Sequence, residues 1–314
     1  MTAHPWRIVF FGTPVFAIPP LQGLLQSDDR IVAVVTQPDR ERGRGRKVTP
    51  SPVKELALQH QIALLQPEKA KDQVFQERIR VLQPDLFIVV AYGQILPKSL
   101  LEIPNHGAVN IHASLLPKYR GAAPIPWAIL NGEAVTGVTT MMLDEGLDTG
   151  AVLLQAEIPI EEKETAETLS GRLSLLGARL LRETIRRMKQ RDVQPIAQDP
   201  SQATYAPPLK KENGRIDWTK EAEEIDRRVR AFNPWPGAFT GWEGRVLKIY
   251  RGEVRERTPD GKPGSVSWVG SDFIEVETGQ GLFLIREIQL EGKKRMSARD
   301  FLPGHPVRPG TVFG

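Results

Sequence analysis

The sequence predicts an α/β domain with a mostly parallel sheet, followed by a small antiparallel β-barrel. Three observations support this fold class: the length of the chain, an alternation of apolar runs with helical stretches in its first half, and short alternating runs near its end. With 314 residues the chain is long for one hydrophobic core, so two domains are the natural expectation.

The strands of the first domain are predicted from short, strongly apolar runs. Arg7–Phe11 is typical of a buried strand that leads into a helix, and residues 30–36 and 85–92 repeat the pattern. Residues 52–60 predict a helix that begins with a proline and is capped by Ser51. Strands that alternate with helices favour a parallel sheet covered on both faces.

This domain is predicted to end in a strand pair and a long helix. Residues 137–143 and 151–158 have the pattern of two strands joined by the turn 144–150. Residues 165–190 predict an amphipathic helix, with leucines at helical spacing and Arg and Glu opposite them. Residues 194–211 are rich in Pro, Gln, Ser and Lys and lack a period, which is typical of a linker.

Beyond the linker the apolar runs become short. After one helix at about 221–232, five alternating runs follow at residues 238–242, 246–251, 264–269, 273–277 and 282–289. Turns such as Pro259-Asp260-Gly261 separate them, which indicates a small antiparallel barrel. We place the first domain at residues 1–191, the linker at 192–208 and the barrel domain at 209–314.

Composition narrows the functional classes. The absence of cysteine excludes disulfides, thiolate nucleophiles and cysteine-ligated zinc. The net charge of +4 is only a mild basic excess, so the position of the charge matters more than its sum. Residues 1–6 lack the apolar core of a signal peptide, and no apolar run reaches the length of a membrane span. We therefore expect a cytoplasmic protein that does not enter a membrane.

The first strand-to-helix turn argues against a dinucleotide cofactor. It reads Gly12-Thr13-Pro14-Val15-Phe16, whereas a pyrophosphate needs the further glycines of Gly-x-Gly-x-x-Gly for close backbone approach. A dehydrogenase is therefore the weakest functional candidate.

Asn110 and His112 are the first candidates for catalysis. They close the apolar run that begins at Ala108, and ligands of α/β sheets collect at the carboxyl ends of strands. Being two positions apart, their side chains share one face of the strand. Both could donate hydrogen bonds to a developing oxyanion, a contribution of about 3–4 kcal/mol per donor in acyl transfer. A structural role for the histidine is the alternative.

Asp144 and Asp148 both lie in the turn between the two predicted strands. Either carboxylate can satisfy backbone amides of the turn, since Asp is a common turn residue. A carboxylate that faces His112 would instead hold the imidazole, favour its protonated form and accept a proton from an attacking amine.

A basic, glycine-rich segment spans residues 37–47, with Arg40, Arg42, Arg44 and Arg46 followed by Lys47. Clustered arginines repel one another without an anionic partner, and glycine lets a backbone approach a phosphate closely. The segment is therefore interpreted as a loop that contacts RNA, with a solvated connector as the alternative. Farther on, Trp235 in the segment 233–239 could stack on a base, but packing of one domain on another is the favoured interpretation.

These segments together resemble the methionyl-tRNA formyltransferase family over nearly the whole chain. The resemblance rests on residues 11–17, 43–54, 90–97, 110–117, 120–125, 147–150 and 232–238. It implies a Rossmann-like formyltransferase domain followed by an OB-like barrel that binds tRNA. It also implies a cytoplasmic enzyme that is a monomer and requires no metal.

The resemblance assigns roles to individual residues. Asn110, His112 and Asp148 correspond to the catalytic trio. The folate site would include Tyr92, Gly93, Ser114, Leu115, Leu116, Pro117 and Asp144. Contacts to tRNA would come from Arg42, Arg44, Arg46 and Lys47, with Arg44 the best single candidate for the acceptor stem.

The expected reaction is transfer of a formyl group from 10-formyltetrahydrofolate to the α-amino group of methionyl initiator tRNA. A formyltransferase that acts on a small amine, such as a nucleotide sugar or glycinamide ribonucleotide, would share the Asn, His and Asp. The arginine segment and the barrel favour RNA, because a small-amine enzyme needs neither. An RNA-binding protein with an inactive α/β domain is disfavoured by the complete trio.

Overall fold

The computed structural model describes residues 4–42 and 47–314. The chain divides into two compact units. The first comprises residues 1–124, 135–159 and 170–206, and the second comprises residues 125–134, 160–169 and 207–314. The domain boundaries proposed from the sequence stay predictions.

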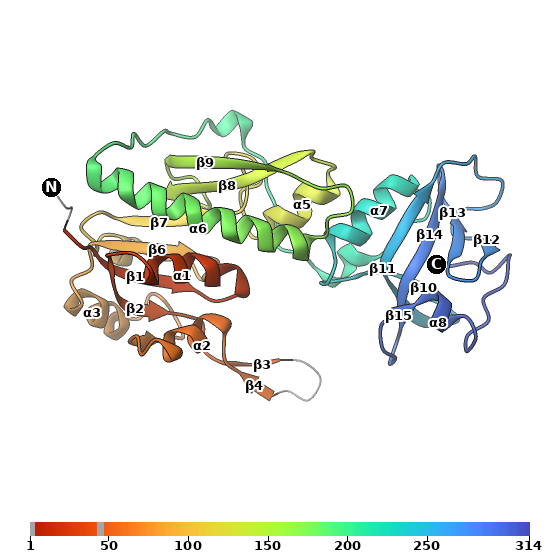
Figure 1. The fold of residues 1–314 in the computed structure, drawn as a ribbon, viewed down its shortest axis with the longest axis horizontal. Coiled ribbons are helices and arrows are strands. Elements are labelled where there is room, and N and C mark those ends of the chain that lie inside the picture. The colour runs from red at the N-terminus through yellow and green to blue at the C-terminus, as the bar shows by residue number, and fades with distance from the viewer. Residues whose placement is uncertain (1–3, 43–46) are drawn as a thin grey trace. The chain divides into compact units, whose positions relative to one another are not determined.

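Seven strands of the first unit form one sheet in the order β5-β2-β1-β6-β7-β8-β9 (Figure 1). Their bounds are β1 Arg7–Gly12, β2 Arg30–Val35, β5 Leu64–Leu65, β6 Leu86–Val90, β7 Ala108–His112, β8 Val135–Met142 and β9 Val152–Pro159. Neighbouring strands from β5 to β7 are parallel, whereas β8 is antiparallel to both β7 and β9. The predicted α/β class with a mostly parallel sheet is confirmed.

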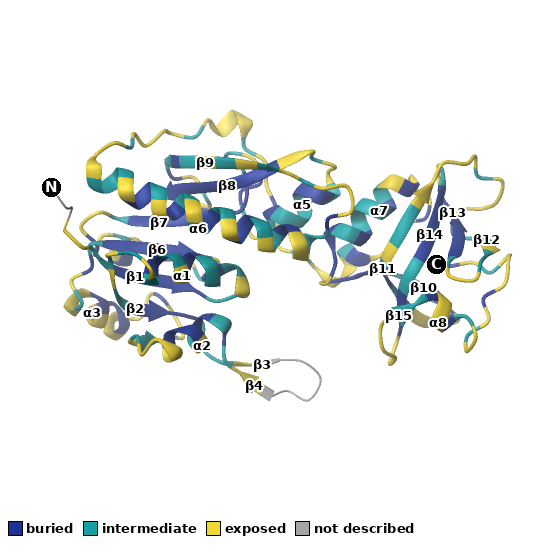
Figure 2. Cartoon of the chain, viewed as in Figure 1, coloured by how far each residue is buried: buried dark blue, intermediate teal, exposed yellow. Residues whose placement is uncertain are grey.

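The α-helices up to residue 190 are α1 Ile18–Leu25, α2 Pro52–Gln59, α3 Gln73–Val81, α4 Lys98–Leu101, α5 Pro124–Leu130 and α6 Ala166–Gln190. On one face of the sheet, α3 contributes Phe75 and Ile79 to a buried core that includes Phe11 and Phe87. The central strands β6 and β7 are buried along their whole length (Figure 2). None of the helices in the described part of the chain is long and apolar enough to cross a membrane.

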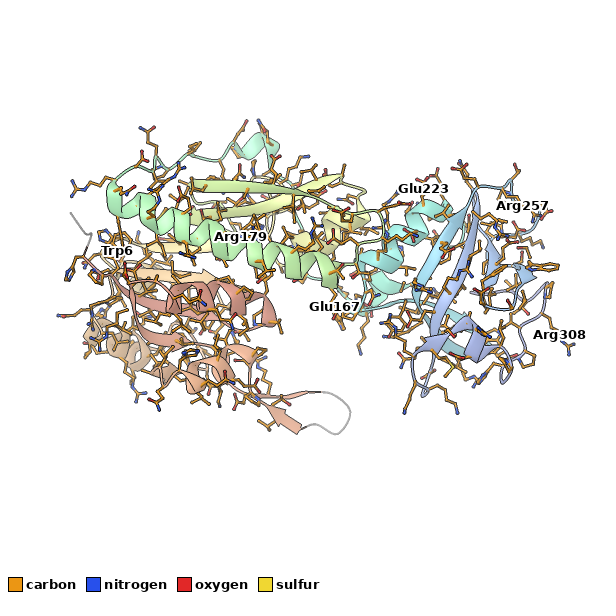
Figure 3. The ribbon with its side chains drawn as sticks, viewed as in Figure 1. Trp6, Glu167, Arg179, Glu223, Arg257 and Arg308 are labelled. Atoms are coloured by element: carbon orange, nitrogen blue, oxygen red, sulfur yellow. The ribbon has the colours of Figure 1, made fainter. Side chains whose placement is uncertain are left out.

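Helix α6 lies against the other face of the sheet. It comes so close that a Cβ on Gly177 would lie 3.0 Å from Cγ2 of Ile111, and Oγ of Ser174 donates a 2.6 Å hydrogen bond to the carbonyl of Phe16. The outer side of α6 carries exposed side chains such as Arg179 (Figure 3). Because Ile111 points to α6, its neighbours Asn110 and His112 point to the opposite face.

The segment predicted as a basic loop contains a short antiparallel hairpin, formed by β3 Arg40–Arg42 and β4 Lys47–Thr49. The sequence has no apolar pattern that indicates these two short strands, and the interpretation of the segment as a loop that contacts RNA stays a prediction. Asp39 anchors the base of the hairpin: its carboxylate accepts from Nζ of Lys54 at 2.5 Å and from Nε2 of Gln66 at 2.9 Å.

The second unit contains α7 Ala222–Ala231 and an antiparallel sheet in the order β10-β11-β14-β13-β12, with β15 paired to β14. The bounds are β10 Ala238–Trp242, β11 Arg245–Arg255, β12 Val266–Val269, β13 Ile274–Glu277, β14 Leu282–Leu290 and β15 Met296–Ser297, with α8 at Ala298–Phe301. The last residues connect the two edges of this sheet: Phe313 N donates to Gly264 O at 2.8 Å, and Gly314 N donates to Gly241 O at 3.1 Å. The predicted small antiparallel barrel is thus present.

Trp235 differs from its neighbours in exposure. Its side chain is 55% exposed, whereas Phe232 and Ala238 on either side of it are fully buried. The interpretation that Trp235 packs one domain on another stays a prediction.

Replacing Ser51 by Ala should weaken the start of α2. Ser51 Oγ accepts from Lys54 N at 3.0 Å and lies 2.7 Å from Thr36 Oγ1, so the change removes a helix cap and leaves the Thr36 hydroxyl without this partner. We expect a loss of about 1–2 kcal/mol of unfolding free energy, measured by urea denaturation. Ser99→Ala, at an exposed position of α4, is the control, and an equal effect of both changes would contradict the capping role.

Candidate active site

Asn110 and His112 lie at the carboxyl end of β7, where β1 and β6 also end. The three strands are parallel, so their carboxyl ends share one edge of the sheet, which is where α/β proteins bind ligands. Asn110 is 9% and His112 is 6% exposed. The structure therefore places these two polar side chains, two positions apart on β7, on the face of the sheet opposite α6.

The imidazole of His112 is held by a backbone carbonyl. Nε2 lies 2.9 Å from the carbonyl oxygen of Tyr119. Because a carbonyl only accepts, Nε2 must carry a hydrogen in this arrangement. The other nitrogen, Nδ1, then either carries a second proton or presents a lone pair, and it lies 3.6 Å from Oδ2 of Asp148.

Asp148 reaches this position from the turn between β8 and β9. Its backbone is left-handed, with φ of 53°, and its side chain is only 13% exposed. Oδ2 accepts a 2.8 Å hydrogen bond from the backbone N–H of Gly121. The same carboxylate oxygen thus faces both the imidazole and the loop after β7.

Of the three side chains, that of Asn110 remains available to form hydrogen bonds with a ligand. Within the described residues its side-chain amide has no hydrogen-bond partner, although the residue is largely buried. The amide atoms are nevertheless not among the fully buried unpaired side-chain atoms of the described residues, so the amide is open to solvent or to a ligand. This position therefore suits a group that receives a ligand oxygen.

The loop after β7, residues 113–121, is tied down on β8 and β9. Ser114 Oγ donates to the carbonyl of Lys118 at 2.6 Å, which closes the loop on itself. Leu116 N donates to Thr139 Oγ1 at 3.1 Å, and Gln155 Nε2 donates to the Leu116 carbonyl at 2.8 Å.

The side chain of Leu115 lies above β8. A Cβ on Gly137 would come within 2.6 Å of its Cδ2. The segment from Ser114 to Pro117 that was predicted to line the folate site is thus held in place directly after Asn110 and His112.

The other predicted folate residues have different surroundings. The Tyr92 side chain is 2% exposed and packs edge-on against Phe11, so only its backbone faces the sheet edge, where its carbonyl accepts from Thr13 Oγ1 at 2.9 Å. Gly93 is exposed with φ of +88°. Asp144 is exposed and its carboxylate accepts from Gly146 N at 3.0 Å within its own turn.

Two of the predicted tRNA-binding residues, Arg42 and Lys47, lie on the strands β3 and β4. They are paired across the hairpin in the backbone ladder. Arg44 and Arg46 lie outside the described residues.

Sequence reasoning missed Tyr119, Gly121 and Gln198. Tyr119 and Gly121 act through backbone groups, which no side-chain pattern reveals. Gln198 comes from the predicted linker, yet its Nε2 donates to the carbonyls of Asp148 and Gly150 at 2.8 and 2.7 Å. In that linker nothing in the sequence distinguished it from its neighbours.

Comparison with known proteins identifies the class to which this fold and site belong. The sequence model "Formyl transferase" matches residues 6–185, and "Formyl transferase, C-terminal domain" matches residues 208–306. The chain is thus a formyl transferase, with both characteristic domains.

Relatives define the family more closely. The methionyl-tRNA formyltransferase of Trichlorobacter lovleyi is 53% identical over 98% of this chain and 97% of its own. That of Geobacter metallireducens is 52% identical over 98% of each chain. The chain belongs to the methionyl-tRNA formyltransferase family.

Among solved structures, HypX from Aquifex aeolicus in complex with tetrahydrofolic acid aligns with 95% of this chain at a TM-score of 0.67 and 18% identity. The aligned part is 47% of that chain, so this chain spans about half its length. At this identity the likeness supports the fold alone.

Replacing Tyr92 by Phe should remove a pH dependence of stability. Burial raises the pKa of Tyr92 from 10.0 to about 12, so the phenol ionises more readily in the unfolded chain than in the fold. The stability it contributes is complete below pH 10 and is lost as the pH rises towards 12.

Urea unfolding at about pH 9 and about pH 11 measures this effect. The wild type should lose more stability between the two than Tyr92→Phe does. Tyr205→Phe, at a tyrosine that is 65% exposed, should behave as the wild type. Equal losses in all three proteins would contradict the assignment to Tyr92.

Proposed function

We propose that Asn110, His112 and Asp148 catalyse the reaction of this chain, transfer of a formyl group from 10-formyltetrahydrofolate to the α-amino group of methionyl initiator tRNA, which supports translation initiation. The observation that carries the proposal is an unpaired Asn110 amide beside an imidazole that faces a carboxylate at 3.6 Å, all at one sheet edge.

The nucleophile is the neutral amine of the methionyl group. With an α-amino pKa near 7.7–8.0, roughly a tenth to a fifth of such amines are neutral at pH 7. Attack on the formyl carbon gives a tetrahedral intermediate with a negative oxygen. The amide of Asn110 stabilises this oxyanion, since the donor is already in place at the end of β7 and its hydrogen bond strengthens as charge develops.

His112 and Asp148 accept the proton that the amine loses. The sequence suggested His112 as a second oxyanion donor, but Nε2 is engaged by the Tyr119 carbonyl. The remaining nitrogen, Nδ1, faces Asp148, so a proton received there lies next to a carboxylate that stabilises it. The amine proton thus passes to the His112–Asp148 pair. When the intermediate collapses, the bond between the formyl carbon and N10 of the folate breaks and the pair returns a proton to N10, so tetrahydrofolate leaves and no covalent enzyme intermediate is needed.

The folate substrate would lie beside this trio. Ser114, Leu115, Leu116 and Pro117 form the rigid loop on one side. Tyr92 and Gly93 would contribute backbone groups, because the Tyr92 side chain is buried and Gly93 has no side chain to block a planar ring. Asp144 stands in the exposed turn and would complete the site.

The tRNA substrate would bind Arg42, Arg44, Arg46 and Lys47, of which Arg42 and Lys47 are paired across β3 and β4. The anchor at Asp39 supports this: its carboxylate binds Lys54 and Gln66, and these hydrogen bonds lower the pKa of Asp39. A basic hairpin held at its base can present positive charge to a phosphate backbone.

We also propose that the protein is a cytoplasmic monomer. Sedimentation equilibrium at micromolar concentration tests the monomer, and a dimer mass would refute it. Cell fractionation tests the location, and recovery with membranes would refute it.

Removing the catalytic side chains should abolish turnover without loss of folate binding. His112→Ala and Asp148→Asn should lower kcat by roughly 10²–10⁴-fold, and Asn110→Ala by about 10²–10³-fold. The folate KM should change by less than about threefold, because these groups act in the transition state. His60→Ala, an exposed histidine at the end of α2, is the control. A parallel rise of the folate KM in all three variants would assign them to binding instead.

The acceptor is tested by formyl transfer to charged initiator tRNA, with elongator methionyl-tRNA and free methionine as comparisons. Product on the initiator alone is expected.

Arg44→Ala should raise the tRNA KM about tenfold and reduce its salt dependence by about one ion, with the folate KM unchanged. Arg179→Ala, on the exposed side of α6, removes the same charge elsewhere. Identical tRNA kinetics in both variants would refute the role of the hairpin, and product on free methionine would favour a small-amine enzyme.

A further inference from the structure

We propose that Gln198 is a positioning residue for formyl transfer, because its side-chain amide holds the turn that carries Asp148 against His112. This inference rests on the catalytic role of Asp148 proposed above. Gln198 lies between residues 185 and 208, outside both matched regions of the formyl transferase family.

Its contacts fix the orientation of the Gln198 amide. Oε1 accepts from Nε and Nη2 of Arg120 at 3.1 and 2.8 Å, and Nε2 donates to the carbonyls of Asp148 and Gly150 at 2.8 and 2.7 Å. A guanidinium only donates and a carbonyl only accepts, so the reverse orientation would oppose like groups at all four contacts. The amide therefore has one stable orientation.

The turn needs this support because its backbone is strained. Asp148 has φ of 53°, in the left-handed region that residues with a Cβ rarely adopt. Two residues later the chain runs so close to β8 that a Cβ on Gly150 would lie 1.7 Å from the carbonyl oxygen of Met142. Gln198 bonds to the carbonyls on both sides of Thr149 and so restrains the backbone from which the catalytic carboxylate projects.

Arg120 strengthens the restraint. It is 4% exposed, and its guanidinium directs two hydrogen bonds to Oε1 of Gln198. Hydrogen bonds from a cation polarise the acceptor amide, which makes its N–H groups better donors. The charge of Arg120 is thus transmitted to the two carbonyls of the turn.

The chain that follows Gln198 also supports His112, the residue that Asp148 faces. Thr204 Oγ1 accepts from Tyr119 N at 2.8 Å, and the Thr204 carbonyl accepts from Arg120 N at 2.8 Å. The carbonyl of Tyr119 in turn holds Nε2 of His112 at 2.9 Å. Gln198 and Thr204 therefore support both members of the proton-accepting pair, Gln198 through the turn of Asp148 and Thr204 through Tyr119, which holds His112.

Three substitutions test the proposal in the full-length enzyme. Gln198→Ala removes all four contacts, and a displacement of about 1 Å at a catalytic group costs on the order of 10²-fold in rate. We expect kcat to fall by roughly that factor while the KM values for folate and tRNA change less than about threefold. Gln198→Glu keeps an acceptor for Arg120 but places an oxygen against two carbonyls, so it should remain folded and still lose turnover. Gln202→Ala, an exposed glutamine in the same segment, should behave as the wild type.

A double-mutant cycle separates positioning from general stability. If Gln198 acts through the Asp148 carboxylate, Gln198→Ala should cause little further loss in an Asp148→Asn background, whereas a merely structural role would lower kcat equally in both backgrounds. The inference is overturned if the two losses multiply, or if both Gln198 variants turn over as the wild type does. In the second case Asp148→Asn still reports on the proposed function. Full activity of Asp148→Asn would overturn both.

Discussion

The hydrogen bond between Nε2 of His112 and the carbonyl of Tyr119 is the interaction on which the site depends. It determines which imidazole nitrogen carries a hydrogen and directs the other nitrogen to Asp148. The bond can form only if the chain returns to the end of β7 seven residues after leaving it. The hydrogen bonds of the Leu116 backbone with Thr139 and Gln155 stabilise this conformation of the loop.

The segment between the two family-matched regions, residues 186–207, forms backbone hydrogen bonds with the loop after β7. Residues 203–206 are outside any helix or strand, so their N–H and C=O groups need partners elsewhere. Thr204 N donates to the Pro117 carbonyl at 3.3 Å, and Ala206 N donates to the Arg120 carbonyl at 2.7 Å. A stretch with the composition of a linker thereby becomes part of the scaffold of the site.

Much of the fold was predictable because its signals are local. The buried strands β1, β2 and β6, the cap at Ser51 and the long helix α6 each follow from runs of a few residues with a clear period. The β3–β4 hairpin was not predictable, because its register comes from backbone pairing and from the anchor at Asp39.

The sequence by itself determined the fold class, the placement of Asn110 and His112 on one face of a strand, and the resemblance to a family of formyl-transferring enzymes. Only the tertiary structure decided that Nε2 of His112 is held by a carbonyl, that Asp148 is held by an amide of the loop, and that Gln198 reaches the turn. The reason is physical. A periodic pattern reports which face of an element is buried, whereas backbone carbonyls and amides are the same in every residue and acquire a role only through their positions in space.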